Sequence, residues 1–149
     1  MRIIQFVHTL NYGDAISGEA LLIRDLAREA GYQSDIYCVH VHEKLKGQAL
    51  NYQSINPADL ADCIILLHHS IASPLNKLFQ RSYLARRGII YHNLTPAKWF
   101  TEYNPRVEQD LIYGREESYQ SLFRKQILLL LIRIITLMKL ARTCNFTQK

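Results

Sequence analysis

The chain has 149 residues, of which 48% are apolar, which suits one compact domain and excludes an intrinsically disordered protein. The formal net charge is +5, but residues 1–117 carry 12 Lys and Arg against 13 Asp and Glu, so the whole surplus lies in residues 118–149. The basic character is therefore no argument for nucleic-acid binding by the main body, and no nucleic-acid partner is predicted.

The three cysteines are Cys38, Cys63 and Cys144, and no two of them form a CxxC pair. An odd number of scattered cysteines argues against a disulfide framework and against a cysteine zinc site. The N-terminus also lacks the longer apolar segment of a secretory signal peptide. We therefore expect a protein of the reducing cytoplasm.

The first forty residues predict a β-α-β unit. Residues 2–7 form an apolar run typical of a buried strand, residues 18–30 show the spacing of an amphipathic helix, and residues 34–39 predict a second strand. Such a unit belongs to a parallel sheet.

The caps and faces of this first helix can also be predicted. Ser17 is the expected N-cap and Gly31 the expected C-terminal stop. The repeat of apolar residues predicts an inner face of Leu22, Ile23, Leu26, Ala27 and Ala30. The charged residues, Arg24 among them, are expected on the solvent face.

The later elements continue the same alternation. Residues 40–56 are polar and irregular, with a short element near Leu45, and residues 57–61 predict a helical turn. Alternating strands and helices then follow at 63–67, 75–86, 88–91 and 105–125. The sequence thus predicts an α/β fold, a Rossmann-like parallel sheet in three layers.

Histidines follow the predicted strands at their carboxyl ends. His8, His68, His69 and His92 each stand at or just past such an end. In open α/β sheets, ligands bind beyond the carboxyl ends of the strands. This placement predicts a binding site along one edge of the sheet.

The loop after the first strand holds Gly13, Asp14 and Ser17. It matches neither GxGxxG nor GxxxxGK[ST], which disfavours a nicotinamide cofactor and a P-loop nucleotide. A helix N-terminus there would still offer backbone N–H groups to an anion. The other interpretation is a turn glycine followed by a helix cap.

The adjacent pair His68 and His69 is a poor metal site. Neighbouring residues of a strand point to opposite faces of the sheet, and no carboxylate lies nearby in the sequence. No metal is predicted, and one of the two histidines is expected to line a cleft. His92 and Asn93 form the next polar strand end, where His92 is either a ligand for a sugar hydroxyl or phosphate, or a structural histidine.

Three separated segments carry a family resemblance. MRIIQFVHTLNYGDAISGEALLIRDLAREAGYQSDIY, LLHHSIASPL and GIIYHNLTPAKWF resemble the N-terminal domain of bacterial family 4 glycosyltransferases. Those GT-B enzymes have two Rossmann-like domains that face each other across a cleft. The resemblance covers about residues 1–125 and implies that they form one acceptor-side GT-B half.

The resemblance also implies roles for individual residues. His92 matches the histidine that the family places near the reacting sugar, and is the expected catalytic residue. The loop beside the donor diphosphate is matched by Gly13, Asp14 and Ser17. The acceptor-side wall is matched by His68 and His69, and Asn93 directly follows His92. The implied reaction transfers a sugar from a nucleotide-sugar, the expected donor, to a hydroxyl of a glycan or lipid-linked acceptor, usually with retention. No other cofactor is expected.

The family's second domain supplies most donor contacts, and the chain lacks a segment resembling it. A cleft with one wall cannot fix the donor or exclude water. We therefore expect no turnover by this chain alone.

Residues 126–149 predict a last strand followed by a basic, apolar tail. Because the letters do not match the family there, we interpret them as the product of a frameshift near Lys125. One alternative is a stand-alone module that binds a sugar or a phosphate. The other is a peripheral membrane protein, because the apolar segment from Ile127 to Leu140 is too short to span a bilayer but could lie on an anionic membrane surface.

Overall fold

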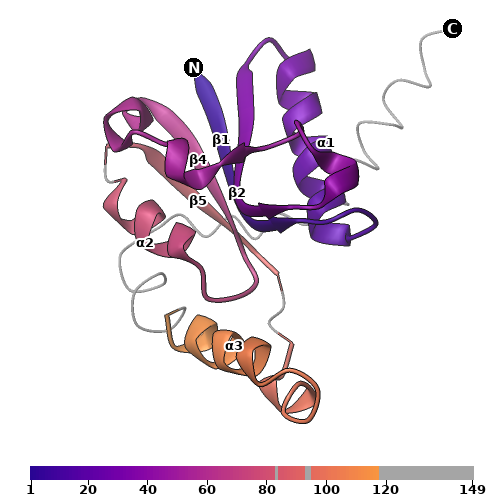
Figure 1. Cartoon of the computed structure of the whole chain (residues 1–149). Helices are drawn as coiled ribbons and strands as arrows, with labels where there is room; N and C mark the ends of the chain where they lie inside the picture. The colour runs from indigo at the N-terminus through magenta and orange to yellow at the C-terminus, as the bar shows by residue number, and fades with distance from the viewer. Residues whose placement is uncertain (83, 93–94, 118–149) are drawn as a thin grey trace, which may run out of the picture.

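The computed structural model describes residues 1–82, 84–92 and 95–117. Five parallel strands form one sheet in the order β3-β2-β1-β4-β5. Figure 1 shows α1 on one face of this sheet and α2 on the other, which confirms the predicted three-layer, Rossmann-like α/β fold. The strands are β1 Arg2–Leu10, β2 Gln33–Val41, β3 Leu50–Asn51, β4 Cys63–His69 and β5 Arg86–Tyr91, and the helices are α1 Ala15–Glu29, α2 Pro74–Arg81 and α3 Pro105–Glu117.

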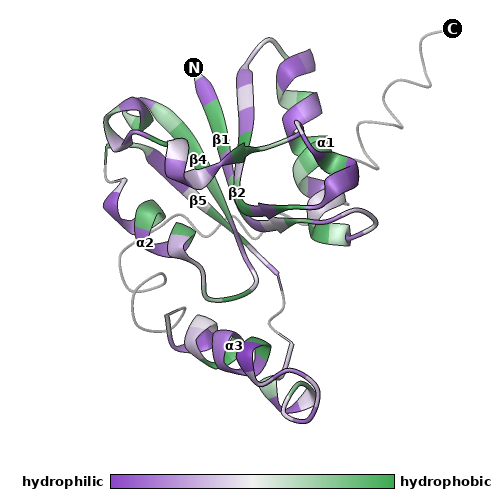
Figure 2. Ribbon diagram, in the orientation of Figure 1, coloured by the Kyte–Doolittle hydropathy of each residue, from purple (hydrophilic) through white to green (hydrophobic). Residues whose placement is uncertain are grey.

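The sheet has a core on each face. On the α2 side, Phe6, Ile65 and Phe79 are fully buried in one cluster, and on the α1 side Val7 and Ile36 belong to a second cluster. Strands covered on both faces need apolar side chains at successive positions, which explains the continuous apolar runs of β1 and β4. Figure 2 shows the apolar residues gathered along these strands.

The order of the strands creates a switch point between β1 and β4. From β1 the chain first adds β2 and β3 on one side, and then adds β4 and β5 on the other. In open α/β sheets, ligands bind beyond the carboxyl ends of the strands at such a switch point. The fold therefore directs attention to the ends of β1 and β4.

The predicted inner face of α1 is only partly right, since Ala27 is buried as expected but the two leucines are not. Leu22 and Leu26 are exposed, at 41% and 44%, whereas Ala20, Arg24 and Ala27 are buried against the sheet. Small alanine side chains let the helix approach the strands closely, so the helix is rotated relative to its most apolar stripe.

Arg24 is buried because its polar groups have partners. Its guanidinium donates to the backbone oxygen of Gln48 at 2.9 Å and pairs with Asp25 at 2.8 Å. A buried charge with such partners is tolerated where an unpaired one would be costly.

Several predicted boundaries also shift. Helix α2 ends at Arg81 rather than residue 86, because Ser82 donates its backbone N–H and its hydroxyl back to the last turn. Strand β3 lies within the region predicted to be irregular, while the short elements near Leu45 and at 57–61 are confirmed as 3₁₀ turns, Glu43–Leu45 and Pro57–Leu60. Gly31, with φ of +83°, follows the end of α1 as predicted.

Helix α3 lies beyond the carboxyl ends of the strands (Figure 1). The backbone N–H of Ala72, in the β4–α2 loop, donates to the backbone oxygen of Asp110 at 3.1 Å. The predicted helix 105–125 is confirmed as far as Glu117, and the predictions for residues 126–149 lie outside the described residues. Among the described residues, no helix is both long and apolar enough to cross a membrane.

Gly114 allows α3 to approach this loop. A Cβ at Gly114 would lie 2.6 Å from the backbone nitrogen of Ala72, closer than any real contact. We expect Gly114→Ala to destabilise the chain by about 1–3 kcal/mol through overpacking. Thermal and urea unfolding would measure the change.

Gly18→Ala is the matched control for this prediction. Gly18 lies inside α1 with nothing within 4 Å of an added Cβ. That substitution should be neutral or stabilising by up to about 1 kcal/mol, because alanine favours the helix. Equal stabilities of the two variants would show that α3 does not dock as described.

Candidate functional site

Three of the predicted site residues lie at the carboxyl ends of β4 and β5. His68 and His69 are the last two residues of β4, and His92 directly follows β5. His8 is a correction to the sequence interpretation: β1 continues to Leu10, so His8 lies inside the strand rather than at its end. The strand is longer than predicted because Thr9 and Leu10 continue the parallel pairing with β2.

The two adjacent histidines of β4 point to opposite faces, as the strand geometry requires. His68 contacts Gln5 on the α1 side of the sheet. His69 is fully buried, and its backbone oxygen accepts from the N–H of His92 at 2.9 Å, which extends the pairing of β4 with β5. Of the pair, His68 is therefore the one that the structure brings to His92, while a binding role for His69 stays a prediction.

A chain of hydrogen bonds crosses the switch point. Gln5 Nε2 donates to the backbone oxygen of Ala20 at 2.9 Å, and Gln5 Oε1 lies 2.9 Å from His68 Nε2. His68 Nδ1 in turn lies 3.0 Å from His92 Nε2, and the two rings are nearly parallel. The chain thus links α1, β1, β4 and the segment after β5.

The amide of Gln5 determines where the protons of this chain lie. Because Gln5 Nε2 is the donor to Ala20, Gln5 Oε1 must accept, so His68 carries its proton on Nε2. His68 Nδ1 then has a lone pair and accepts from the Nε2–H of His92. This assignment leaves His92 Nδ1 as a hydrogen-bond acceptor.

Burial keeps both imidazoles neutral at physiological pH. Desolvation, with a smaller contribution from His92, lowers the pKa of His68 to about 3. Desolvation also lowers the pKa of His92; nearby Asp14 opposes this shift and His69 adds to it. A neutral histidine can accept a proton or hydrogen bond from a ligand hydroxyl.

Glu19 is the carboxylate closest to this chain in the described residues. Its Oε2 lies 3.8 Å from His92 Nε2, and burial raises its pKa. Since His92 is neutral near pH 7, this contact is not an ion pair there. Sequence reasoning missed Glu19 because it lies one turn inside a helix, far from the histidines in the sequence.

The loop of Gly13, Asp14 and Ser17 shapes the start of α1. Asp14, not Ser17, is the N-cap, and its Oδ2 accepts from the backbone N–H of Ser17 at 2.9 Å. Ser17 is buried; its hydroxyl accepts from the N–H of Asn11 and donates toward Asp14. Ser17 was expected as the cap because helical spacing of apolar residues begins late, although the helix itself begins at Ala15.

Gly13 has a φ of +80°, which the turn itself requires of a glycine. A Cβ there would meet nothing within 4 Å, so the described structure places no neighbour against it. Asn93 lies outside the described residues. The predicted roles of Gly13, Asp14, Ser17 and Asn93 toward a ligand stay predictions.

His8 belongs to a second group on the α2 side of β1. Its Nδ1 lies 3.0 Å from the hydroxyl of Ser73, the N-cap of α2, and its ring meets that of His40 edge-on. Burial and His40 lower the pKa of His8, while the Asp110 carboxylate of α3 opposes this. The carboxyl edge therefore carries two polar groups, one on each face, rather than one.

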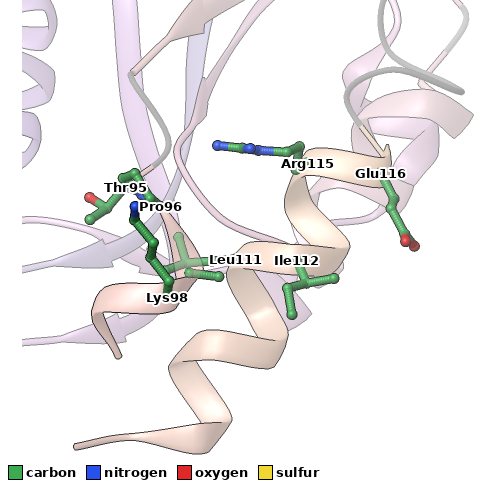
Figure 3. A pocket seen from close by; sticks show the side chains of 8 residues that line it. Thr95, Pro96, Lys98, Leu111, Ile112, Arg115 and Glu116 are labelled. Carbon is green, nitrogen blue, oxygen red and sulfur yellow. The ribbon is translucent and has the colours of Figure 1, made fainter. Parts of the chain in front are cut away.

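A hollow of about 340 Å³ lies between α3 and the segment that follows His92. Figure 3 shows Arg115 reaching across it toward Thr95 and Pro96, with Lys98 on the opposite wall. Among the lining residues these two cations outnumber the one carboxylate, Glu116, so the lining favours an anion.

The comparisons with known proteins found nothing similar: no family model, no curated protein and no solved structure matches the chain.

Proposed function

We propose that this chain is the acceptor-side half of a nucleotide-sugar-dependent glycosyltransferase, working in the cytoplasm. The three segments that resemble the family 4 enzymes support the proposal. The observation that carries it is the Gln5–His68–His92 chain at the switch point, which orients a neutral histidine at the edge where α/β folds bind their ligands.

The proposed role of His92 is to receive a hydrogen bond from a sugar hydroxyl through Nδ1. A neutral, oriented imidazole is suited to this task, whereas an imidazolium would only donate. Gln5 and His68 would act as positioning residues, because they fix the proton of His92 on Nε2.

Positive charge and free N–H groups would face the donor diphosphate. The first turn of α1, capped by Asp14, offers backbone N–H groups. Lys98 and Arg115 line the hollow between α3 and residues 95–98. An oxocarbenium-like transition state and a departing diphosphate both need such preorganised groups. The second wall of the cleft would come from a separate donor-binding domain.

Complementation tests the proposal. The full chain is mixed with a separately expressed C-terminal domain of a family 4 glycosyltransferase, and nucleoside diphosphate release is followed over a panel of nucleotide-sugars and glycan acceptors. We expect release from the mixture and none from either part. His92→Gln should lower the rate about 10²–10³-fold, as loss of one preorganised hydrogen-bonding group in an active site does.

His42→Gln is the matched control, because His42 caps the 3₁₀ turn after β2 and contacts Tyr12 instead of the histidine chain. It should keep the rate of the unmodified mixture. Glycan binding without any release would favour a non-catalytic sugar-binding module. Binding only to anionic vesicles would favour the peripheral membrane role.

A further inference from the structure

Three side chains with metal-binding atoms converge at the α1 end of the histidine chain. One ligand atom each from Glu19, His68 and His92 lie within 4.8 Å of one another. They come from α1, from β4 and from the segment after β5, so only the fold brings them together. We propose that Glu19, His68 and His92 bind a divalent transition-metal ion of the zinc class, a site that goes beyond the proposed sugar transfer.

The three donor atoms, all within 4.8 Å of one another, lie near the spacing that such an ion needs. Four-coordinate zinc with bonds of 2.0–2.1 Å holds its donor atoms about 3.3 Å apart. His68 Nδ1 and His92 Nε2 are 3.0 Å apart, and His92 Nε2 and Glu19 Oε2 are 3.8 Å apart. Small rotations of the Glu19 and His92 side chains would place an ion between the three donors.

The surroundings of His68 are those of a metal ligand. Its Nε2–H donates to Gln5 Oε1, and Gln5 is itself held by the backbone oxygen of Ala20. Metal-bound histidines typically donate their second N–H to an oxygen in this way, which fixes the ring and the tautomer. His68 Nδ1 is therefore unprotonated and becomes available to an ion once His92 gives up the hydrogen bond between the two rings.

The donor set selects the class of ion. Two imidazole nitrogens and one carboxylate oxygen suit Zn²⁺, Co²⁺ and similar ions, whereas Mg²⁺ and Ca²⁺ favour oxygen ligands. His68 is buried, but Glu19 and His92 are 25% and 15% exposed, which gives an ion a way in. With three protein ligands, water would fill the fourth position.

Ion binding would change the tautomer of His92. The Nε2 proton that His92 shares with His68 Nδ1 would move to His92 Nδ1, so that both facing nitrogens bind the ion. No proton need be released. His92 Nδ1 would then donate rather than accept, so the ion would inhibit the sugar transfer proposed above.

The sequence interpretation predicted no metal, because it considered only neighbours along the chain. His68 and His69 cannot share an ion, as their opposite faces show. The ligands proposed here lie far apart in the sequence, at positions 19, 68 and 92.

Calorimetric titration of the metal-free full chain with Zn²⁺, and Co²⁺ absorption spectroscopy, test the site. Both use a Cys144→Ser background to remove the thiol outside the described residues. We expect one ion per chain and the visible absorption of four-coordinate Co²⁺. Glu19→Gln should weaken Zn²⁺ binding at least 10-fold, and His92→Gln at least as much.

Glu43→Gln and His42→Gln are the matched controls, since both residues lie at the 3₁₀ turn after β2. They should leave the affinity unchanged, and circular dichroism would show that every variant folds. Absence of stoichiometric binding, or equal losses in the controls, would overturn the proposal. Neither result depends on sugar transfer, so the site and the proposed function can fail separately.

Discussion

When the pH falls from 7 to 5, the free energy of unfolding should decrease by about 2 kcal/mol more in the unmodified chain than in the His68→Gln variant. The folded pKa of His68 is about 3, while its ordinary value is 6.5. Between these values the unfolded chain binds a proton at His68 and the folded chain does not. Stability from this group is therefore complete above pH 6.5 and is lost as the pH falls toward 3.

Urea unfolding of both proteins at several pH values, in buffer with a chelator, measures this effect. The buried His8 and His92, whose pKa values are also lowered, add a loss in the same direction in both proteins. Only the difference between the proteins reports His68. Parallel pH profiles would mean that His68 is protonated as easily in the folded chain as in the unfolded one.

Gln5→Leu should destabilise the chain by about 1–3 kcal/mol, because it leaves the buried Nε2–H of His68 without its acceptor. Leucine is similar in size to glutamine, so the loss would come from the hydrogen bonds rather than from a cavity. Denaturant unfolding at pH 7 measures the change.

A double-mutant cycle separates this explanation from a packing effect. His68→Phe removes the donor, so the double variant Gln5→Leu, His68→Phe should cost less than the two single variants together, by about 0.5–3 kcal/mol. Strict additivity would show that Gln5 and His68 do not depend on each other.

Gln5→Glu tests the contact between Gln5 and His68 in a second way, because it should change the pH dependence of stability in the opposite direction to its effect on stability at pH 7. A carboxylate beside His68 would favour the imidazolium and raise the pKa of that histidine. The variant should be less stable than the parent at pH 7, since a charge is buried, but should lose less stability as the pH falls. A steeper loss with falling pH would contradict the assigned contact.

The apolar runs predicted the parallel sheet because period and length alone identify buried strands. The same reasoning was only partly right for α1: Ala27 is buried as expected, but Leu22 and Leu26 are exposed. Close packing of Ala20 and Ala27 against the sheet decided the rotation, and such tertiary fit leaves little trace in a hydrophobic repeat.

Sequence reasoning located the edge of the candidate site but not its partners. His68 and His92 were expected because they end strands, whereas Glu19 came to them only through the folding of α1 onto the sheet. Gln5 did carry a signal: it is the one amide inside an apolar strand, and a polar residue there needs a buried partner. Which partner it has could not be predicted without the strand order.

The attachment of α3 has a consequence for how the chain could diversify. The contact of Asp110 with Ala72 uses the backbone oxygen of Asp110, so other side chains at position 110 would leave this hydrogen bond in place. At position 114, in contrast, any side chain would collide with the backbone of Ala72. The close approach of α3 to the β4–α2 loop therefore depends on the absence of a side chain at position 114. Arg115, the next residue of α3, lines the hollow, so a substitution there would change the charge of the hollow while leaving the close approach at Gly114 in place.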